Sequence, residues 1–117
     1  MSKLQYDVAV IGAGMVGSAL ASLLSRSGFS VALVETNEPQ PFDADAEVGL
    51  RVSAISPGSA AVLQQTGAWT QVSAQRARPY RRMQVEDGVD LDPLVFDAPV
   101  FNLERLGTIV ENALLQW

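Results

Sequence analysis

The chain has 117 residues, of which 48% are hydrophobic and 18% are charged, and its formal net charge is −5. This composition is typical of one soluble globular domain or part of one, and the acidity argues against a nucleic-acid interface, which needs a basic face. The sequence contains no cysteine and no histidine. Disulfides, thiolate nucleophiles, a Ser-His-Asp triad and the usual zinc sites are therefore excluded for this chain alone, and we expect no metal. Lack of cysteine fits a cytoplasmic location.

The stretch from Val8 to Glu35 has the pattern of a dinucleotide-binding β-α-β unit. A buried strand over residues 8–11 leads into a turn with glycines at Gly12, Gly14 and Gly17. The first glycine permits the tight turn, the second lets a phosphate approach the backbone, and the third lets helix and strand pack closely. The helix that starts there directs free N–H groups and the positive end of its dipole at a pyrophosphate.

The helix and the strand after it complete this unit. Apolar residues recur at helical spacing, so we expect one helix face to lie on the sheet. Gly28 stands where a left-handed cap belongs, and residues 29–34 predict a second strand that delivers Glu35 to the carboxyl edge. Glu35 follows Gly12 at close to the ~20-residue separation of the acid that accepts ribose hydroxyls. A carboxylate there would repel a ribose 2′-phosphate, which favours FAD or NAD over NADP. The apolar residues of the helix face are Val16, Ala19, Leu20, Leu23 and Leu24.

Two other interpretations of the same stretch have to be weighed. Residues 8–24 carry no charge, which would also suit a membrane span or a signal peptide. A span needs ~20 apolar residues, whereas this run contains three glycines and directly follows Asp7. A secretory signal needs a positive start, and Lys3 alone is a poor one. A β-α-β unit that binds no nucleotide is the second alternative.

The next segment combines a loop with a short helix. Residues 37–48 hold two prolines and several acids and predict a surface loop. Ser56 followed by Pro57 predicts a helix start, with the hydroxyl as cap and the proline at the first helical position, and Gly67 predicts its end.

Arg51 and Ser53 lie just ahead of that predicted helix. An arginine at this place can hold phosphate or ribityl oxygens through a forked, always-charged contact. It can equally be a surface residue that pairs with Glu47. Spacing alone does not decide between the two.

A basic cluster precedes an acidic one in the middle of the chain. A basic patch can bind anions, but with acids so close the usual outcome is a solvated, mutually compensating surface. Residues 81–86 and 94–97 predict two strands, with Asp87-Gly88 supplying a turn. We expect this pair to open a second sheet. The charged residues are Arg76, Arg78, Arg81, Arg82, Glu86, Asp87, Asp90 and Asp92.

From Asn102 onward the spacing of the apolar residues predicts a helix without a stop signal. A doubly wound sheet also needs more than the two parallel strands predicted here. We therefore expect the chain to be the N-terminal piece of a longer protein. The apolar stripe consists of Leu103, Leu106, Ile109, Val110, Ala113, Leu114 and Trp117.

Five segments follow one another as they do in the ubiquinone-biosynthesis hydroxylases, and the chain resembles this family over essentially its whole length. These enzymes belong to the FAD-dependent aromatic hydroxylases related to p-hydroxybenzoate hydroxylase. One departure is Gly49, where many relatives carry an aspartate. The segments are VAVIGAGMVGSALA (8–21), LRVSAI (50–55), GAW (67–69), MQVED (83–87) and LGTIVEN (106–112).

The resemblance implies an α/β fold, with a Rossmann-like FAD-binding β-α-β unit followed by the beginning of a second, substrate-domain sheet. Residues 1–75 would then form the FAD-binding part. Residues 76–101 would supply the first strands of the substrate domain, and residues 102–117 would form a helix that returns to the FAD-binding part.

The resemblance also implies a set of cofactor-binding residues. Arg51 matches the family arginine that reaches the flavin side of FAD. Asn112 matches a polar position that faces the cofactor, the alternative being an amide on a helix surface. No catalytic acid or base for the substrate is identifiable. The implied FAD contacts are Gly12, Ala13, Gly14, Met15, Val16, Gly17, Glu35, Thr36, Arg51 and Asn112.

Members of this family reduce FAD with NAD(P)H, let it react with O₂ and transfer one oxygen to a phenolic ring. The resemblance thus implies a polyprenyl-phenol substrate, peripheral contact with a membrane or with other enzymes of ubiquinone biosynthesis, and no nucleic acid. The family's later Gly-Asp segment has no counterpart here, so the chain by itself is expected to be inactive. Alternatives are a fragment of another FAD oxidoreductase, such as an amine or halogenating enzyme, and a non-catalytic dinucleotide-binding module.

Overall fold

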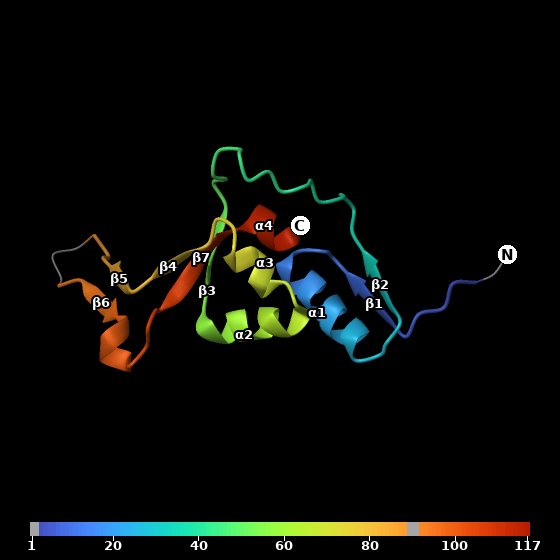
Figure 1. The fold of residues 1–117 in the computed structure, drawn as a ribbon, viewed down its shortest axis with the longest axis horizontal. Coiled ribbons are helices and arrows are strands. Elements are labelled where there is room, and N and C mark those ends of the chain that lie inside the picture. Colours follow the sequence, from blue (N-terminus) through green and yellow to red (C-terminus); the bar gives the residue numbers. More distant parts are fainter. Residues whose placement is uncertain (1–2, 89–91) are drawn as a thin grey trace.

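Three small sheets follow one another along the long axis of the molecule, and most helices lie between the first and the second (Figure 1). The computed structural model describes residues 3–88 and 92–117 and measures 67 × 32 × 30 Å. The strands are β1 (Val8–Ile11), β2 (Val31–Val34), β3 (Val52–Ile55), β4 (Arg78–Tyr80), β5 (Arg82–Val85), β6 (Leu94–Asp97) and β7 (Gly107–Glu111). The helices are α1 (Met15–Arg26), α2 (Pro57–Thr66), α3 (Trp69–Ser73), the 3₁₀ helix η1 (Ala98–Phe101) and α4 (Asn112–Gln116).

The first sheet is the β-α-β unit that the glycine pattern predicts. β1 and β2 pair in parallel, from Val8 opposite Val31 to Ile11 opposite Val34, and α1 connects them. Gly28 has φ +92°, the left-handed conformation expected just after the end of α1. The predicted first strand has the observed bounds, and the second begins two residues later than predicted.

The side of α1 that packs on the sheet is narrower than predicted. A Cβ on Gly17 would collide with the carbonyl oxygen of Gly12, and Ala21, one turn later, is the buried residue of the helix. The prediction that the apolar stripe lies on the sheet is wrong for most of its members, because they face α2 instead, and Val16 is 78% exposed. A groove lies between α1 and α2. The residues of the stripe that line it are Val16, Ala19, Leu20 and Leu23.

The predicted start and end of α2 are confirmed. Ser56 caps the helix by accepting a hydrogen bond from the Ser59 N–H at 3.1 Å, and Pro57 occupies the first helical position. Gly67 ends the helix with φ +86°, a left-handed conformation that suits glycine.

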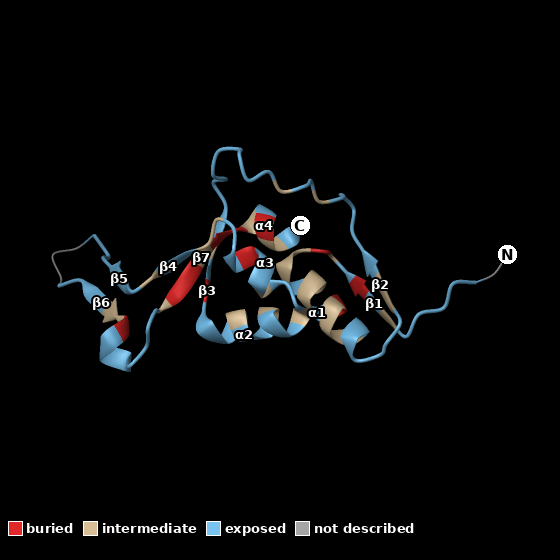
Figure 2. Ribbon diagram, viewed as in Figure 1, coloured by how far each residue is buried: buried red, intermediate tan, exposed pale blue. Residues whose placement is uncertain are grey.

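The middle sheet has the order β3-β7-β4, with both pairs antiparallel. β7 lies at its centre and is buried along most of its length, as the red colour on β7 in Figure 2 shows. Val110 is fully buried and contacts Ile55, Val72 and Leu114 in the main hydrophobic cluster. β7 is therefore the strand around which the core is built.

The helix predicted over residues 102–117 is wrong for its first two thirds. Residues 107–111 form a strand, and only Asn112–Gln116 are helical at its end. The segment Gly-Thr-Ile-Val combines glycine with three β-branched residues, which disfavour helix and suit a covered strand. Pairing with a strand on each side decides the conformation, and this pairing cannot be read from apolar spacing.

The predicted strand pair in the middle of the chain is confirmed and forms the third sheet. β5 and β6 are antiparallel, from Arg82 opposite Asp97 to Val85 opposite Leu94. Gly88, in the predicted turn, has φ +78°. The rest of the turn, including Asp90, lies outside the described residues. This sheet occupies the end of the molecule opposite β1 and β2 (Figure 1).

Shortening Val110 tests the central position of β7. Val110→Ala removes two methyl groups from a site with no exposure, so we expect a loss of about 2 kcal/mol in the free energy of unfolding. Val100→Ala makes the same change at a residue that is 76% exposed and should change stability by less than about 0.5 kcal/mol. Urea unfolding of both variants measures the difference, and equal losses would contradict the assignment of the core.

Candidate functional site

The glycine turn between β1 and α1 places the N-terminus of α1 at the carboxyl edge of the first sheet. Gly12 has φ +97°, and its N–H donates to the carbonyl of Val34 at 2.8 Å. Gly14 is the N-cap of α1 in an extended conformation and gives no side-chain cap. The first N–H groups of a helix have no partner within it. α1 also has no acid in its first turn, so this end suits an anionic ligand.

Glu35 follows β2 and reaches across to this turn. Its Oε2 accepts the N–H of Ala13 at 2.7 Å, and its Oε1 accepts the N–H of Thr36 at 2.7 Å and the Thr36 hydroxyl at 2.9 Å. These bonds favour the ionised carboxylate and lower the pKa of Glu35 to about 2. The bond from the Ala13 N–H has the largest effect, and the bond from the Thr36 hydroxyl has the next largest. Glu35 is therefore charged and fixed in place at neutral pH.

A hollow of about 260 Å³ lies beside Glu35 and Ala13. Its other walls come from the loop after β2 and from Gln116, the last residue of α4. The Nε2 of Gln116 lies 3.9 Å from where a Cβ on Gly14 would stand. Sequence reasoning missed Gln116, because only the antiparallel return of β7 brings α4 to the glycine turn. The loop residues that line the hollow are Asn37, Glu38 and Pro39.

Arg51, predicted to reach the flavin side of FAD, and Asn112, predicted to face the cofactor, lie next to each other. The N–H of Asn112 donates to the carbonyl of Arg51 at 3.0 Å, and the Ser53 hydroxyl donates to Oδ1 of Asn112 at 2.6 Å. The Arg51 side chain is exposed. In the part of the chain that the structure describes, it forms no ion pair with Glu47.

Arg76 and Glu111 form an ion pair that the sequence did not predict. The distance from Arg76 Nε to Glu111 Oε2 is 2.9 Å, and the two side chains are 25% and 5% exposed. Arg76 also donates to the carbonyls of Ala46 at 2.5 Å and Asp43 at 3.2 Å, and it lies over the ring of Phe42. The interpretation of Arg76 as part of a solvated basic cluster is therefore wrong. The one signal of a buried ion pair in the sequence was the place of Glu111, an acid directly after a run of β-branched residues.

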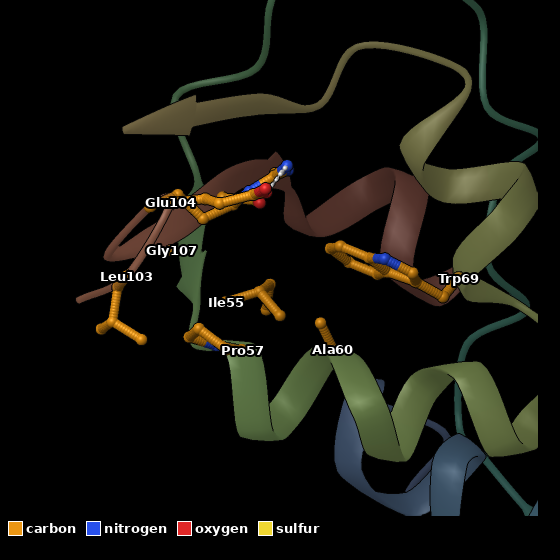
Figure 3. A pocket seen from close by; sticks show the side chains of 9 residues that line it. Ile55, Pro57, Ala60, Trp69, Leu103, Glu104 and Gly107 are labelled. Carbon is orange, nitrogen blue, oxygen red and sulfur yellow. Dashed lines mark ion pairs between the residues drawn. The ribbon is translucent and has the colours of Figure 1, made fainter. Parts of the chain in front are cut away.

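A larger hollow, of about 410 Å³, lies on the other side of α2 from the α1 groove. Figure 3 shows Ile55, Pro57 and Ala60 along one wall and Trp69 across from the segment that precedes β7. The dashed line marks the exposed pair of Glu104 and Arg105, 3.6 Å apart. None of the glycine-turn residues lines this hollow, so its size does not make it the nucleotide site.

A parallel β-α-β unit with a glycine turn, an open helix N-terminus and an ionised acid after β2 defines a dinucleotide-binding domain. Comparison with known families specifies the class: the family described as "FAD binding domain" matches residues 5–98. The chain belongs to this family, which confirms the predicted α/β fold and FAD as its cofactor. No helix of residues 3–88 or 92–117 has the length and apolarity needed to cross a membrane.

Individual relatives agree with the resemblance noted in the sequence. The chain is 42% identical over 116 residues to the 3-demethoxyubiquinol 3-hydroxylase of Escherichia coli, which covers 99% of this chain and 29% of that enzyme. It is also 42% identical over 115 residues to the mitochondrial ubiquinone biosynthesis monooxygenase COQ6 of Xenopus tropicalis, covering 94% and 24%. The chain thus spans less than a third of the length of either relative.

Solved structures show the same fold. A mutant of PqsL from P. aeruginosa superposes with a TM-score of 0.68 at 24% identity, covering 95% of this chain and 28% of that one. The p-nitrophenol 4-monooxygenase PnpA from Pseudomonas putida gives a TM-score of 0.68 at 20% identity, covering 99% and 27%.

The hydrogen bonds of Glu35 predict a pH dependence of stability. Because its pKa is lowered in the folded chain, the stabilisation from Glu35 is complete above its ordinary value of 4.5 and is lost as the pH falls toward about 2. Glu35→Gln should therefore reduce stability at pH 7, and the difference from wild type should shrink between pH 4.5 and pH 2. Urea unfolding across this range measures it, with Glu47→Gln as a control for loss of one loop charge. A constant difference would contradict the assignment.

Proposed function

We propose that the chain is the FAD-binding part of a flavin-dependent monooxygenase that hydroxylates a polyprenylated phenol in ubiquinone biosynthesis, using NAD(P)H and O₂. The observation that carries this proposal is the 42% identity, over nearly the whole chain, to a 3-demethoxyubiquinol 3-hydroxylase and to a ubiquinone biosynthesis monooxygenase. The relatives are several times longer, so the activity is that of the whole enzyme, and the chain alone is expected to be inactive.

The residues at the glycine turn fit the ADP half of FAD. Gly14 leaves the approach to the first N–H groups of α1 free of a side chain, which a pyrophosphate needs. The ionised Glu35 provides a hydrogen-bond acceptor for ribose hydroxyls beside a hollow of about 260 Å³. In this proposal the N–H groups of Met15, Val16 and Gly17 face the phosphates. The N–H of Ala13 and Thr36 hold Glu35 in place.

Arg51 and Asn112 would meet the flavin half. Arg51 offers a permanent positive charge and five donors, and Asn112 offers an amide at the end of β7. The bound flavin supplies the redox chemistry, accepting electrons from NAD(P)H and activating O₂. The role of the chain is to bind FAD, to orient it through these residues, and to keep a 2′-phosphate out with the charge of Glu35.

The division of the chain into parts belongs to the same proposal. We assign residues 1–75 to FAD binding, residues 76–101 to the start of a substrate-binding part, and residues 102–117 to the return toward FAD. The β5–β6 sheet, at the far end from the glycine turn, supports the second assignment (Figure 1). The contacts of Asn112 and Gln116 near Arg51 and Gly14 support the third.

An apolar prenyl substrate also leads us to propose a cytoplasmic enzyme that contacts the membrane surface or other enzymes of the pathway. The exposed arginines of β4, of β5 and of the position between them are suited to anionic headgroups. They are Arg78, Arg81 and Arg82.

The proposed activity can be tested on the gene product purified from its native cells with an antibody against residues 8–35. We expect it to carry FAD and to transfer ¹⁸O from ¹⁸O₂ to a polyprenyl phenol in the presence of NAD(P)H. A product with FAD but no labelled phenol would favour another class of FAD oxidoreductase. A product without FAD would contradict the proposal.

Gly14→Ala separates cofactor binding from folding. Gly14 has φ −68°, and an added Cβ would meet only Gln116 Nε2, at 3.9 Å, so we expect stability to change by less than about 0.5 kcal/mol. The same Cβ stands in the path of the pyrophosphate, and we expect FAD to bind at least about tenfold more weakly by isothermal titration calorimetry. Gly17→Ala is the matched contrast, because its Cβ would collide with the Gly12 carbonyl and should lower stability itself. Unchanged FAD affinity in Gly14→Ala would contradict the placement of the phosphates.

A further inference from the structure

The Arg76–Glu111 ion pair lies outside the predicted cofactor residues but directly beside two of them. Arg76 Nε and Glu111 Oε2 are both buried, and within residues 3–88 and 92–117 neither makes a hydrogen bond to any other group. The Glu111 oxygen therefore depends on Arg76 for a balancing positive charge, and the Arg76 nitrogen depends on Glu111 for an acceptor. Removing one partner leaves the other desolvated and unpaired, which is strongly unfavourable.

The second oxygen of Glu111 holds the chain that leads to Arg51. Oε1 accepts the N–H of Gly49 at 2.7 Å, two residues before Arg51. A Cβ on Gly49 would stand 3.4 Å from this oxygen, an ordinary van der Waals contact, so the bond uses the backbone at this position and does not require glycine. Val52, the next residue after Arg51, pairs with Glu111 in the sheet. One carboxylate thus fixes the backbone just before Arg51, and strand pairing fixes it just after.

Asn112 is fixed at the same corner. It follows Glu111 directly, its N–H donates to the Arg51 carbonyl at 3.0 Å, and its Oδ1 accepts the Ser53 hydroxyl at 2.6 Å. Arg51, Asn112 and the ion pair are therefore linked through short backbone and side-chain contacts. A shift of the Glu111 carboxylate would move both proposed flavin-side residues.

Arg76 supplies the other anchor of this corner. Its guanidinium donates to the carbonyls of Asp43 and Ala46 and lies 5.1 Å from the ring centroid of Phe42, which packs against the hydrophobic core. The loop from residue 42 to residue 50 is mostly exposed and has no regular secondary structure. These contacts order it before a ligand arrives, which reduces the entropy lost on binding.

We propose that Arg76 and Glu111 are positioning residues for FAD. They touch no part of the cofactor, and they fix the backbone that presents Arg51 and Asn112 to its flavin half. This inference rests on the proposed function and extends it, because it assigns the pair to one half of the cofactor only. The ADP half is met by the glycine turn and Glu35. Among the described residues, the hydrogen bonds of Glu35 go to Ala13, Thr36 and Asn37 and not to Arg76.

The experiment measures the binding of FAD and of ADP by isothermal titration calorimetry to the whole gene product, freed of bound flavin and prepared with and without the substitutions below. Wild type should bind FAD more tightly than ADP. Arg76→Leu should weaken FAD binding at least about tenfold and leave ADP binding within about twofold. Glu111→Gln keeps an acceptor for Gly49 but loses the charge, and it should fall between wild type and Arg76→Leu.

Two further variants separate positioning from general loss of structure. Arg76→Lys keeps the positive charge but loses the forked contacts, so it should recover part of the FAD affinity and keeps the test valid if Arg76→Leu does not fold. Arg105→Leu removes an arginine from an exposed pair and should bind both ligands as wild type does. Circular dichroism at the titration temperature checks that each variant is folded.

The outcomes distinguish failure of the positioning role from failure of the proposed function. Selective loss of FAD affinity in folded Arg76 variants supports the positioning role. Equal losses of FAD and ADP affinity would assign the pair to general stability, and unchanged FAD affinity would show that the corner is not coupled to the flavin side; either result overturns this inference alone. A wild-type chain that binds neither ligand would overturn the proposed function and this inference with it.

Discussion

The burial of β7 is the constraint on which the rest of the structure depends. A central strand must have a hydrogen-bonding partner on each edge and apolar cover on each face, and β3, β4 and the neighbouring helices supply these for β7. β7 is the last strand of the chain, and it carries α4 back to the glycine turn. A single strand thus connects the core with both sides of the candidate cofactor site.

The same burial explains the ion pair. Glu111 is the last residue of this covered strand and is buried with it. An ionised carboxylate in the interior needs a charge partner and hydrogen-bond donors. Arg76 and the N–H of Gly49 provide them. The long loop after β2 is consequently held against the core by polar contacts and by Phe42 rather than by secondary structure of its own. Its order follows from the need to neutralise one buried acid.

The features that the sequence predicted correctly are set by local chemistry. The tight turn at Gly12, the cap at Ser56 and the stop at Gly67 each follow from residues close together in the chain. The features that it did not predict depend on distant partners. Arg76 and Glu111 are 35 residues apart. The residues around each of them do not indicate that the other is its partner. The helix predicted across residues 107–111 failed for the same reason, since an apolar stripe does not show whether two other strands will pair with it.

The two sides of the candidate site differ in how well the sequence predicts them. In the proposed function these two sides correspond to the two halves of a dinucleotide. The proposed ADP side uses the turn at Gly14 and the acid Glu35, both within one β-α-β unit, so its residues are fixed by a fold that many sequences share. The proposed flavin side uses Arg51 and Asn112, whose separation in the chain is bridged through β3 and β7. The first half can therefore be recognised from a motif, whereas the second requires the tertiary structure. A shared motif secures binding of the nucleotide, and the contacts that differ between families of the same fold determine how the flavin is presented.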